Sequence, residues 1–321
     1  MAPTLPPEVL LDILEQADPS TLRSSSRIAR SFRVPSQYLL HRNLSLLTPT
    51  SLKAYQDACG TRRDFAARKL HLLMGTVGEE GIKVLEKAHA MRELVLKSER
   101  RKVKAEVLEQ KNLAGLTDLR LEAPFAAPES SSLSFPFSLA SLTIRGLYSS
   151  LPTAVLDALV ASSLATLTTL DIDAYGSNTS ASTFFSSLLP LAPHLLSLEL
   201  HGSDRRVEPI FPFLALARRL ETFTCWEPTL PLLCALPPSV KTLNIGANFT
   251  WAHDFSKHSY EEMLTRSGLL NQLETIEWTG ISMYTLKAQR GGELLLAECE
   301  RRGIEVVFGV PSLSAYGINC T

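Results

Sequence analysis

A short phrase, L-x-x-L-x-L, returns along most of the 321-residue chain. It is clearest at Leu116/Leu119/Leu121 and Leu195/Leu198/Leu200. Looser copies extend from Leu44/Leu46 to Ile304/Val306/Phe308, and successive middle anchors lie about 20 to 33 residues apart. A period of this length is typical of units that hold one short strand followed by a helical or irregular return.

Because such units stack on one another, the phrase predicts an α/β leucine-rich repeat solenoid. We expect about nine to ten irregular repeats over residues 44–321, with parallel strands on the concave face and helices or loops outside. The clearest helical returns are expected at Glu79–Ala90, Leu151–Ser163, Thr183–Leu191 and Leu286–Arg302. The Ser- and Pro-rich stretch Pro124–Pro136 should form a loop.

Composition narrows the possible partners and compartments. The net charge of −1 gives no basic surface of the kind that nucleic acid or an anionic membrane attracts, so we expect neither partner. Five cysteines, odd in number and without a C-x-x-C pair, favour a reducing cytoplasmic or nuclear location. Acidic residues inside the first apolar run argue against a signal peptide.

Residues 1–43 follow a different pattern from the repeats. Helices are expected over Glu8–Gln16, from Ser20 as cap to about Arg33, and over Ser36–Arg42, with Val34-Pro35 as a break. Apolar side chains cover about 200° of the first helix, whereas a surface helix turns roughly 100° to its own core. So short a segment buries little internally, and its spare apolar surface needs the repeats or another protein.

The strings L-P-P-E-V-L-L-D-I-L-E-Q-A-D-P-S-T-L and R-I-A-R-S-F resemble an F-box, placed at residues 1–43, with Phe32 where Trp is frequent. The resemblance implies a three-helix domain that docks on the adaptor subunit of cullin-RING ubiquitin ligases. Carried over by position, the adaptor-facing residues are Leu5, Pro6, Val9, Leu10, Ile13, Leu22, Ile28 and Phe32. The alternative is that these helices only cap the solenoid, since terminal repeats need a cap.

Within each repeat phrase the leucines should point into the core, and the residues between and after them should point out along the concave sheet. Solenoids bind partners on that face. The first rows are basic and the middle rows acidic, and Trp226 is an aromatic residue of the kind that anchors interfaces. The candidate substrate-binding residues are Arg120, Arg145, Asp171, Asp173, Glu199, His201, Trp226, Asn244 and Glu277. The long insertion Asn248–Gln272 is a second candidate contact region.

The sequence contains no recognisable metal-binding or catalytic motif. His253, Asp254, His258 and Glu261 match no strong ligand spacing, so we expect no metal site there. No G-x-S-x-G motif and no Cys–His pairing is recognisable, and we expect no cofactor and no enzyme activity.

The sequence thus favours a substrate-recognition subunit of a cullin-RING ligase, with the F-box on the adaptor and an unknown protein substrate on the repeats. The alternative is a leucine-rich repeat interaction scaffold with capping helices.

Overall fold

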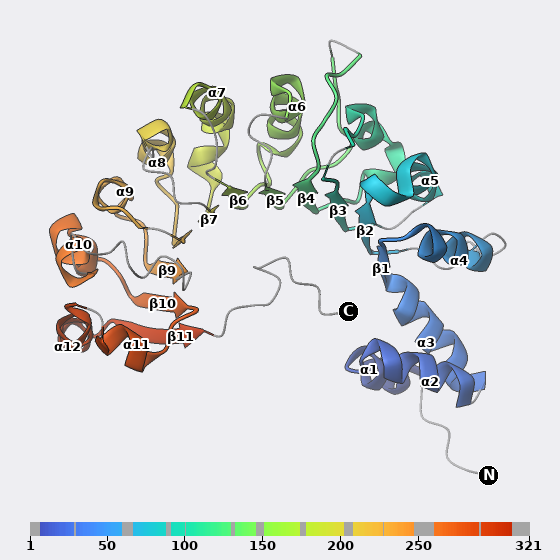
Figure 1. Ribbon diagram of the computed structural model, residues 1–321, viewed down its shortest axis with the longest axis horizontal. Coiled ribbons are helices and arrows are strands. Elements are labelled where there is room, and N and C mark those ends of the chain that lie inside the picture. The colour runs from blue at the N-terminus through green and yellow to red at the C-terminus, as the bar shows by residue number, and fades with distance from the viewer. Residues whose placement is uncertain are drawn as a thin grey trace. The chain divides into compact units, whose positions relative to one another are not determined.

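The computed structural model describes residues 7–28, 30–59, 67–87, 91–99, 101–129, 132–145, 151–173, 178–201, 208–226, 228–246, 260–288 and 290–309. The chain forms two compact units, unit 1 (Met1–Leu139) and unit 2 (Ala140–Thr321). In each unit short strands lie side by side and most of the helices lie behind them (Figure 1). No described helix combines the length and the apolar character needed to cross a membrane.

Unit 1 begins with three helices, α1 (Pro7–Glu15), α2 (Pro19–Ile28) and α3 (Arg30–Arg42). Their buried core consists of Leu10, Leu14, Leu22 and Leu39. The predicted break at Val34-Pro35 is wrong, because α3 continues through Pro35. Helix α3 packs against both α1 and α2, and this packing offsets the backbone hydrogen bond that proline cannot donate.

The sequence suggested Ser20 as the N-cap of α2, but Asp18 caps this helix. Asp18 Oδ1 accepts hydrogen bonds from the backbone N–H groups of Ser20 (2.8 Å) and Thr21 (3.0 Å). Hydrogen bonds from the side chains of Ser20 and Thr21 also hold the pKa of this carboxyl well below its usual range.

The rest of unit 1 holds four strands that pair in parallel and in sequence order, so each strand lies beside the next. The elements are β1 (Asn43–Leu46), α4 (Pro49–Cys59), β2 (Lys69–Leu73), α5 (Met74–Lys87), β3 (Glu93–Lys97), η1 (Ala105–Glu109), η2 (Lys111–Leu113) and β4 (Asp118–Glu122). Residues 124–129 and 132–136 form no helix or named strand, which agrees with the predicted loop, although Phe125 makes one parallel bridge to Val103.

Unit 2 continues the same plan with seven parallel strands, again in sequence order. The strands are β5 (Ser141–Ile144), β6 (Thr169–Asp173), β7 (Ser197–His201), β8 (Thr222–Cys225), β9 (Thr242–Gly246), β10 (Thr275–Thr279) and β11 (Glu305–Gly309). The returns are α6 (Thr153–Ser163), α7 (Asn178–Leu188), η3 (Leu189–His194), η4 (Glu208–Ile210), α8 (Phe211–Leu216), α9 (Leu230–Cys234), α10 (Tyr260–Ser267), η5 (Leu269–Asn271), α11 (Met283–Ala288) and α12 (Gly292–Arg302).

Strands β2 to β10 share one burial pattern, whereas the inward side chains of β11 are only partly buried. Pairing sets Leu142, Leu170 and Leu198 beside one another, and each is almost fully buried. A backbone relay recurs just before the strands: Ala140 O accepts from the N–H groups of Thr168 and Thr169, and Thr168 O accepts in turn from the next repeat. Parallel strands in sequence order, a buried apolar ladder and this relay define a leucine-rich repeat architecture.

The last helical return differs from its prediction. Leu286–Arg302 was expected to be one helix, but α11 and α12 are separate. Gly291 adopts a left-handed conformation with φ 77°, and a Cβ on Gly292 would lie 1.8 Å from the carbonyl oxygen of Leu286. The two glycines therefore permit a tight turn between the helices that other residues would block.

Candidate functional site

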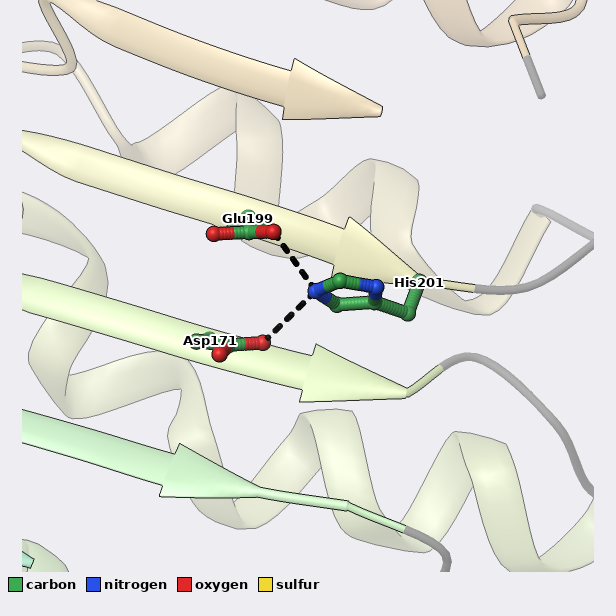
Figure 2. A group of neighbouring side chains, drawn as sticks. All are labelled: Asp171, Glu199 and His201. Carbon is green, nitrogen blue, oxygen red and sulfur yellow. Dashed lines mark ion pairs between the residues drawn. The ribbon is translucent and has the colours of Figure 1, made fainter. Parts of the chain in front are cut away.

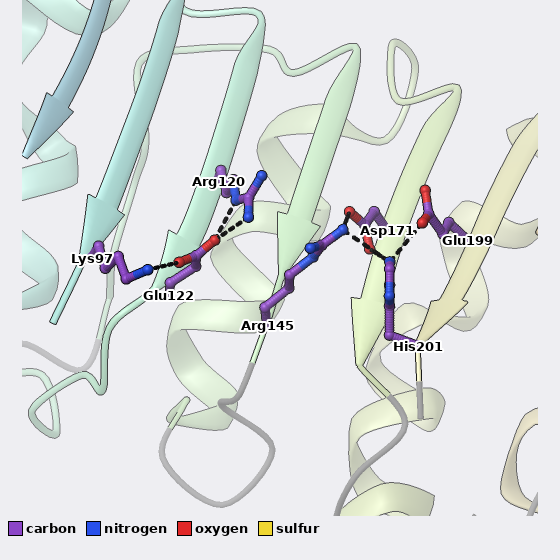
Figure 3. A network of polar contacts seen from close by, with 7 residues as sticks. All are labelled: Lys97, Arg120, Glu122, Arg145, Asp171, Glu199 and His201. Atoms are coloured by element: carbon purple, nitrogen blue, oxygen red, sulfur yellow. Dashed lines mark hydrogen bonds and ion pairs between the residues drawn. The ribbon is translucent and has the colours of Figure 1, made fainter. Parts of the chain in front are cut away.

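The first three strands of unit 2 carry on their sheet face a cluster of four ionisable side chains from three neighbouring repeats (Figure 3). Figure 2 shows three of them, Asp171, Glu199 and His201. Arg145 follows β5, Asp171 lies on β6, and Glu199 and His201 lie on β7. Arg145 Nη2 lies 2.8 Å from Asp171 Oδ2 and 2.9 Å from His201 Nε2. His201 Nε2 lies 2.6 Å from Glu199 Oε1 and 3.2 Å from Asp171 Oδ1.

The mutual contacts shift the titration of this cluster. Burial by itself lowers the pKa of His201, but hydrogen bonding to Asp171 and Glu199 outweighs burial, so the pKa is raised. Burial likewise raises the pKa of Asp171, but the contacts with His201 and Arg145 outweigh it and the pKa is lowered. The charged forms of both residues are therefore favoured in the folded protein.

Two carboxylates and an imidazole are also the donor set of many divalent metal sites. Ligand atoms of Asp171, Glu199 and His201 lie within 4.8 Å of one another. However, the guanidinium of Arg145 already contacts two members of this group, so its positive charge would oppose a metal ion bound there. We interpret the cluster as an ion-pair network across the strands.

The side chain of Trp226 contacts two members of this network, His201 and Glu199. Its ring stacks on His201 with centroids 5.3 Å apart, and its Nε1 donates a hydrogen bond to Glu199 Oε1 at 3.3 Å. On the other neighbouring strand, a Cβ on Gly246 would lie 2.5 Å from the indole. Trp226 is thus held by His201 and Glu199 and given room by Gly246.

The remaining unit-2 candidates lie on the same face. Asn244 Nδ2 donates to Thr224 Oγ1 at 3.2 Å, while its buried Oδ1 has no hydrogen-bond partner among the described residues. Asp173 is half-buried at the end of β6, and its charge helps to raise the pKa of Arg145, which burial alone would lower. Glu277 is half-buried on β10 and forms no ion pair within the described part of the chain.

In unit 1, Arg120 faces outward on β4 as predicted, but the expected basic row is neutralised. Glu122 binds Arg120 and also lies 3.3 Å from Lys97 Nζ (Figure 3). Burial raises the pKa of Glu122, but the two cations outweigh burial and lower it. Arg120 and Lys97 are therefore paired, so neither is a free cation on an open basic surface.

The residues assigned to adaptor contact fall into two groups. Leu10 and Leu22 are buried in the core of the three helices, and Phe32 packs against that core, so these three stabilise the helices and do not offer an open surface. Val9, Ile13 and Ile28 are exposed by 42%, 52% and 77%. Leu5 and Pro6 lie outside the described residues.

Most of the insertion Asn248–Gln272 also lies outside the described residues, including His253, Asp254 and His258. Its described part forms α10 and η5, where Glu261 accepts a hydrogen bond from Thr265.

Sequence reasoning overlooked two features. One is the role of Gly246, whose lack of a side chain leaves space for the Trp226 ring. The other is His71 on β2, where burial lowers the pKa of the imidazole. A glycine at an outward strand position beside Trp226 was the available signal for the first.

Comparisons with known proteins show no family for this chain. No family model matches the chain, and no curated protein matches it. Among solved structures, it is similar to the leucine-rich repeat-containing protein LegL7 from Legionella pneumophila, with 13% sequence identity and a TM-score of 0.48. That likeness covers 92% of this chain and 88% of the other. The repeat architecture itself rests on the strand register and the buried ladder described above.

Proposed function

We propose that this chain is a non-enzymatic substrate-recognition subunit of a cullin-RING ubiquitin ligase. Helices α1–α3 would dock on the ligase adaptor, and the repeats would hold a protein substrate. Such a subunit contributes to ubiquitin transfer by raising the local concentration of the substrate. The observation that carries the proposal is the exposure of three large apolar side chains, Val9 and Ile13 on α1 and Ile28 on α2, on helices that already have their own core.

These exposed side chains support docking because the core of the three helices forms without them, so folding does not explain their apolar character. Val9 and Ile13 are four residues apart on α1 and share one face of that helix. Leu10, Leu14 and Leu22 fill the core without them. Burying an exposed isoleucine gains on the order of 1.5–3 kcal/mol, which gives a partner a reason to cover these side chains.

A capping role for the same helices is the second candidate function. Helix α3 ends at Arg42 and β1 begins at Asn43, so no linker separates helices and repeats. Arg42 also forms an ion pair with Glu15 on α1. Yet a hollow of about 930 Å³, lined by Leu22, Leu39 and Arg92 among others, lies between these helices and the strand starts. The helices therefore cover this end of the sheet without sealing it.

Two of the described cysteines are unsuited to act as catalytic nucleophiles. The thiol of Cys225 is buried on β8, and burial raises its pKa to about 12. Burial also raises the pKa of Cys299 to about 11. A thiolate is the reactive form of cysteine, so neither residue is suited to attack a substrate near neutral pH.

The experiment is capture of the purified chain by an immobilised cullin adaptor. Ile13→Asp and Ile28→Asp should each abolish capture, because they place a charge in the proposed contact. The matched control is Leu294→Asp, since Leu294 is exposed by 65% on α12. Unfolding curves of all three variants should match that of the parent. Equal capture of the parent and both isoleucine variants would contradict the docking face.

A further inference from the structure

The described strand residues on the sheet face of unit 2 have an excess of negative charge that those of unit 1 lack. In unit 1 the outward strand residues balance, with Lys69, Lys97 and Arg120 against Glu93, Asp118 and Glu122. Among the described residues of unit 2, the fixed charges at outward positions on or directly after the strands are Arg145, Asp171, Asp173, Glu199, Glu277 and Glu305. Arg145 is the one fixed cation among them, although the whole chain carries a net charge of only −1.

The positive groups of this face are already engaged. Arg145 pairs with Asp171, and His201 lies 2.6 Å from Glu199. Glu277 and Glu305, by contrast, have no ion pair with any described residue. Carboxylates that have no ion pair with the described residues attract a cation from outside, and charge complementarity of this kind steers partners to a surface.

A second observation comes from the shape of the same region. Gly246 on β9, Thr279 on β10 and Gly309 on β11 occupy one register row. Their side chains are absent or small, so two neighbours lean into the row. Trp226 leans over Gly246, and a Cβ on Gly309 would lie 2.8 Å from Glu277 Oε1. A row without large side chains of its own thus lies between the indole of Trp226 over β9 and the carboxylate of Glu277 beside β11, which has no ion pair with a described residue.

From these observations we infer that the sheet face of unit 2 binds a basic segment of a protein partner, with a lysine or arginine side chain on Glu277 and its aliphatic part near Trp226. Lysine and arginine fit this row because they combine a charged head with an apolar stem. Aromatic residues held in place are the usual anchors of protein interfaces. Nucleic acid is disfavoured, since its phosphates would meet the same carboxylates. The inference rests on the proposed function and specifies the chemistry of its substrate.

The test uses the full chain and two fluorescent peptides in an anisotropy titration. One peptide alternates lysine and serine and the other alternates glutamate and serine. Each has about ten residues, which is enough to cross several strands spaced ~4.8 Å apart. We expect the basic peptide to bind at least roughly tenfold tighter than the acidic one, and to weaken as salt rises from about 0.05 to about 0.5 M.

Variants locate the contact on this face. Glu277→Gln should weaken binding of the basic peptide by roughly threefold to tenfold, because one charge-assisted contact is lost. Glu300→Gln is the matched control: it removes the same charge from an exposed position on α12 and should leave binding unchanged. Melting curves should show that both variants are folded.

Equal binding of the two peptides, or equal weakening by both variants, would overturn the inference, because binding would then reflect overall charge. Failure here is distinguishable from failure of the proposed function. A sample that is captured by the adaptor but ignores the basic peptide refutes only the basic partner. A sample that binds the peptide at Glu277 but not the adaptor refutes only the ligase role.

Discussion

The indole of Trp226 lies over Gly246 on the neighbouring strand, so closely that a Cβ on that glycine would fall 2.5 Å from the ring. The opposite neighbour, His201, stacks on the same indole. The position of the aromatic residue is therefore set jointly by an imidazole on β7 and by the absence of a side chain on β9.

Gly246→Ala should displace the Trp226 ring, because a contact of that length cannot persist. The indole N–H resonance of Trp226, assigned by its loss in Trp226→Phe, should shift in the NMR spectrum as stacking on His201 changes. Gly115→Ala is the control, since a Cβ there would meet Met91 O at an ordinary 3.5 Å. An unmoved resonance in Gly246→Ala would refute the steric account.

Leu170 tests the buried ladder of the repeats. It is fully buried on β6, so Leu170→Ala should lower the free energy of unfolding by about 2–5 kcal/mol through lost contacts and a cavity. Leu164 lies in the same repeat but is exposed by 40%, and Leu164→Ala should cost less than about 1 kcal/mol. Denaturant unfolding measures both. Equal costs would show that Leu170 does not point inward.

The pair formed by Arg145 and Asp171 should couple energetically. Both side chains are mostly buried, so a double-mutant cycle with Arg145→Met and Asp171→Asn should give a coupling of about 1–3 kcal/mol. The exposed pair of Lys241 and Glu274 should show a smaller coupling, because solvent screens it. No difference between the two cycles in denaturant unfolding would contradict the network.

The raised pKa of His201 predicts that the stability of the folded protein decreases as the pH rises. The folded pKa of His201 lies above its ordinary value of 6.5, so its protonated form adds stability that is fully present below pH 6.5. That stability should disappear as the pH rises through the folded pKa. Thermal melting between about pH 5.5 and pH 9 should show this decline in the parent and not in His201→Gln. Parallel curves for the two proteins would rule out the contribution of His201.

The strands were predictable because each leucine phrase repeats with a period of two on the pleated sheet. Leu170 and Leu198 are buried as expected, and even Trp278 was correctly placed inward at a looser copy. Helix limits were harder, because local signals compete with packing. Pro35 suggested a break that the packing of α3 overrides.

The candidate site was predictable as a set of outward residues and not as a set of contacts. The sequence predicted that Arg145 and Asp171 lie on the concave sheet face, but it could not show that they form an ion pair. It also assigned Leu10 to a partner, whereas Leu10 closes the core of the three helices. Which apolar residues of an amphipathic helix stay exposed depends on how its neighbours pack, and a single helix pattern does not contain that information.

Calorimetric titration of the full chain with the cullin adaptor tests the central claim most directly. The account predicts saturable binding with a negative heat-capacity change, because the apolar side chains of Val9, Ile13 and Ile28 become buried. Ile13→Asp should abolish the heat, and Leu294→Asp should leave it unchanged. No binding by a folded parent protein would contradict the ligase role and leave helices α1–α3 as a cap on the repeats.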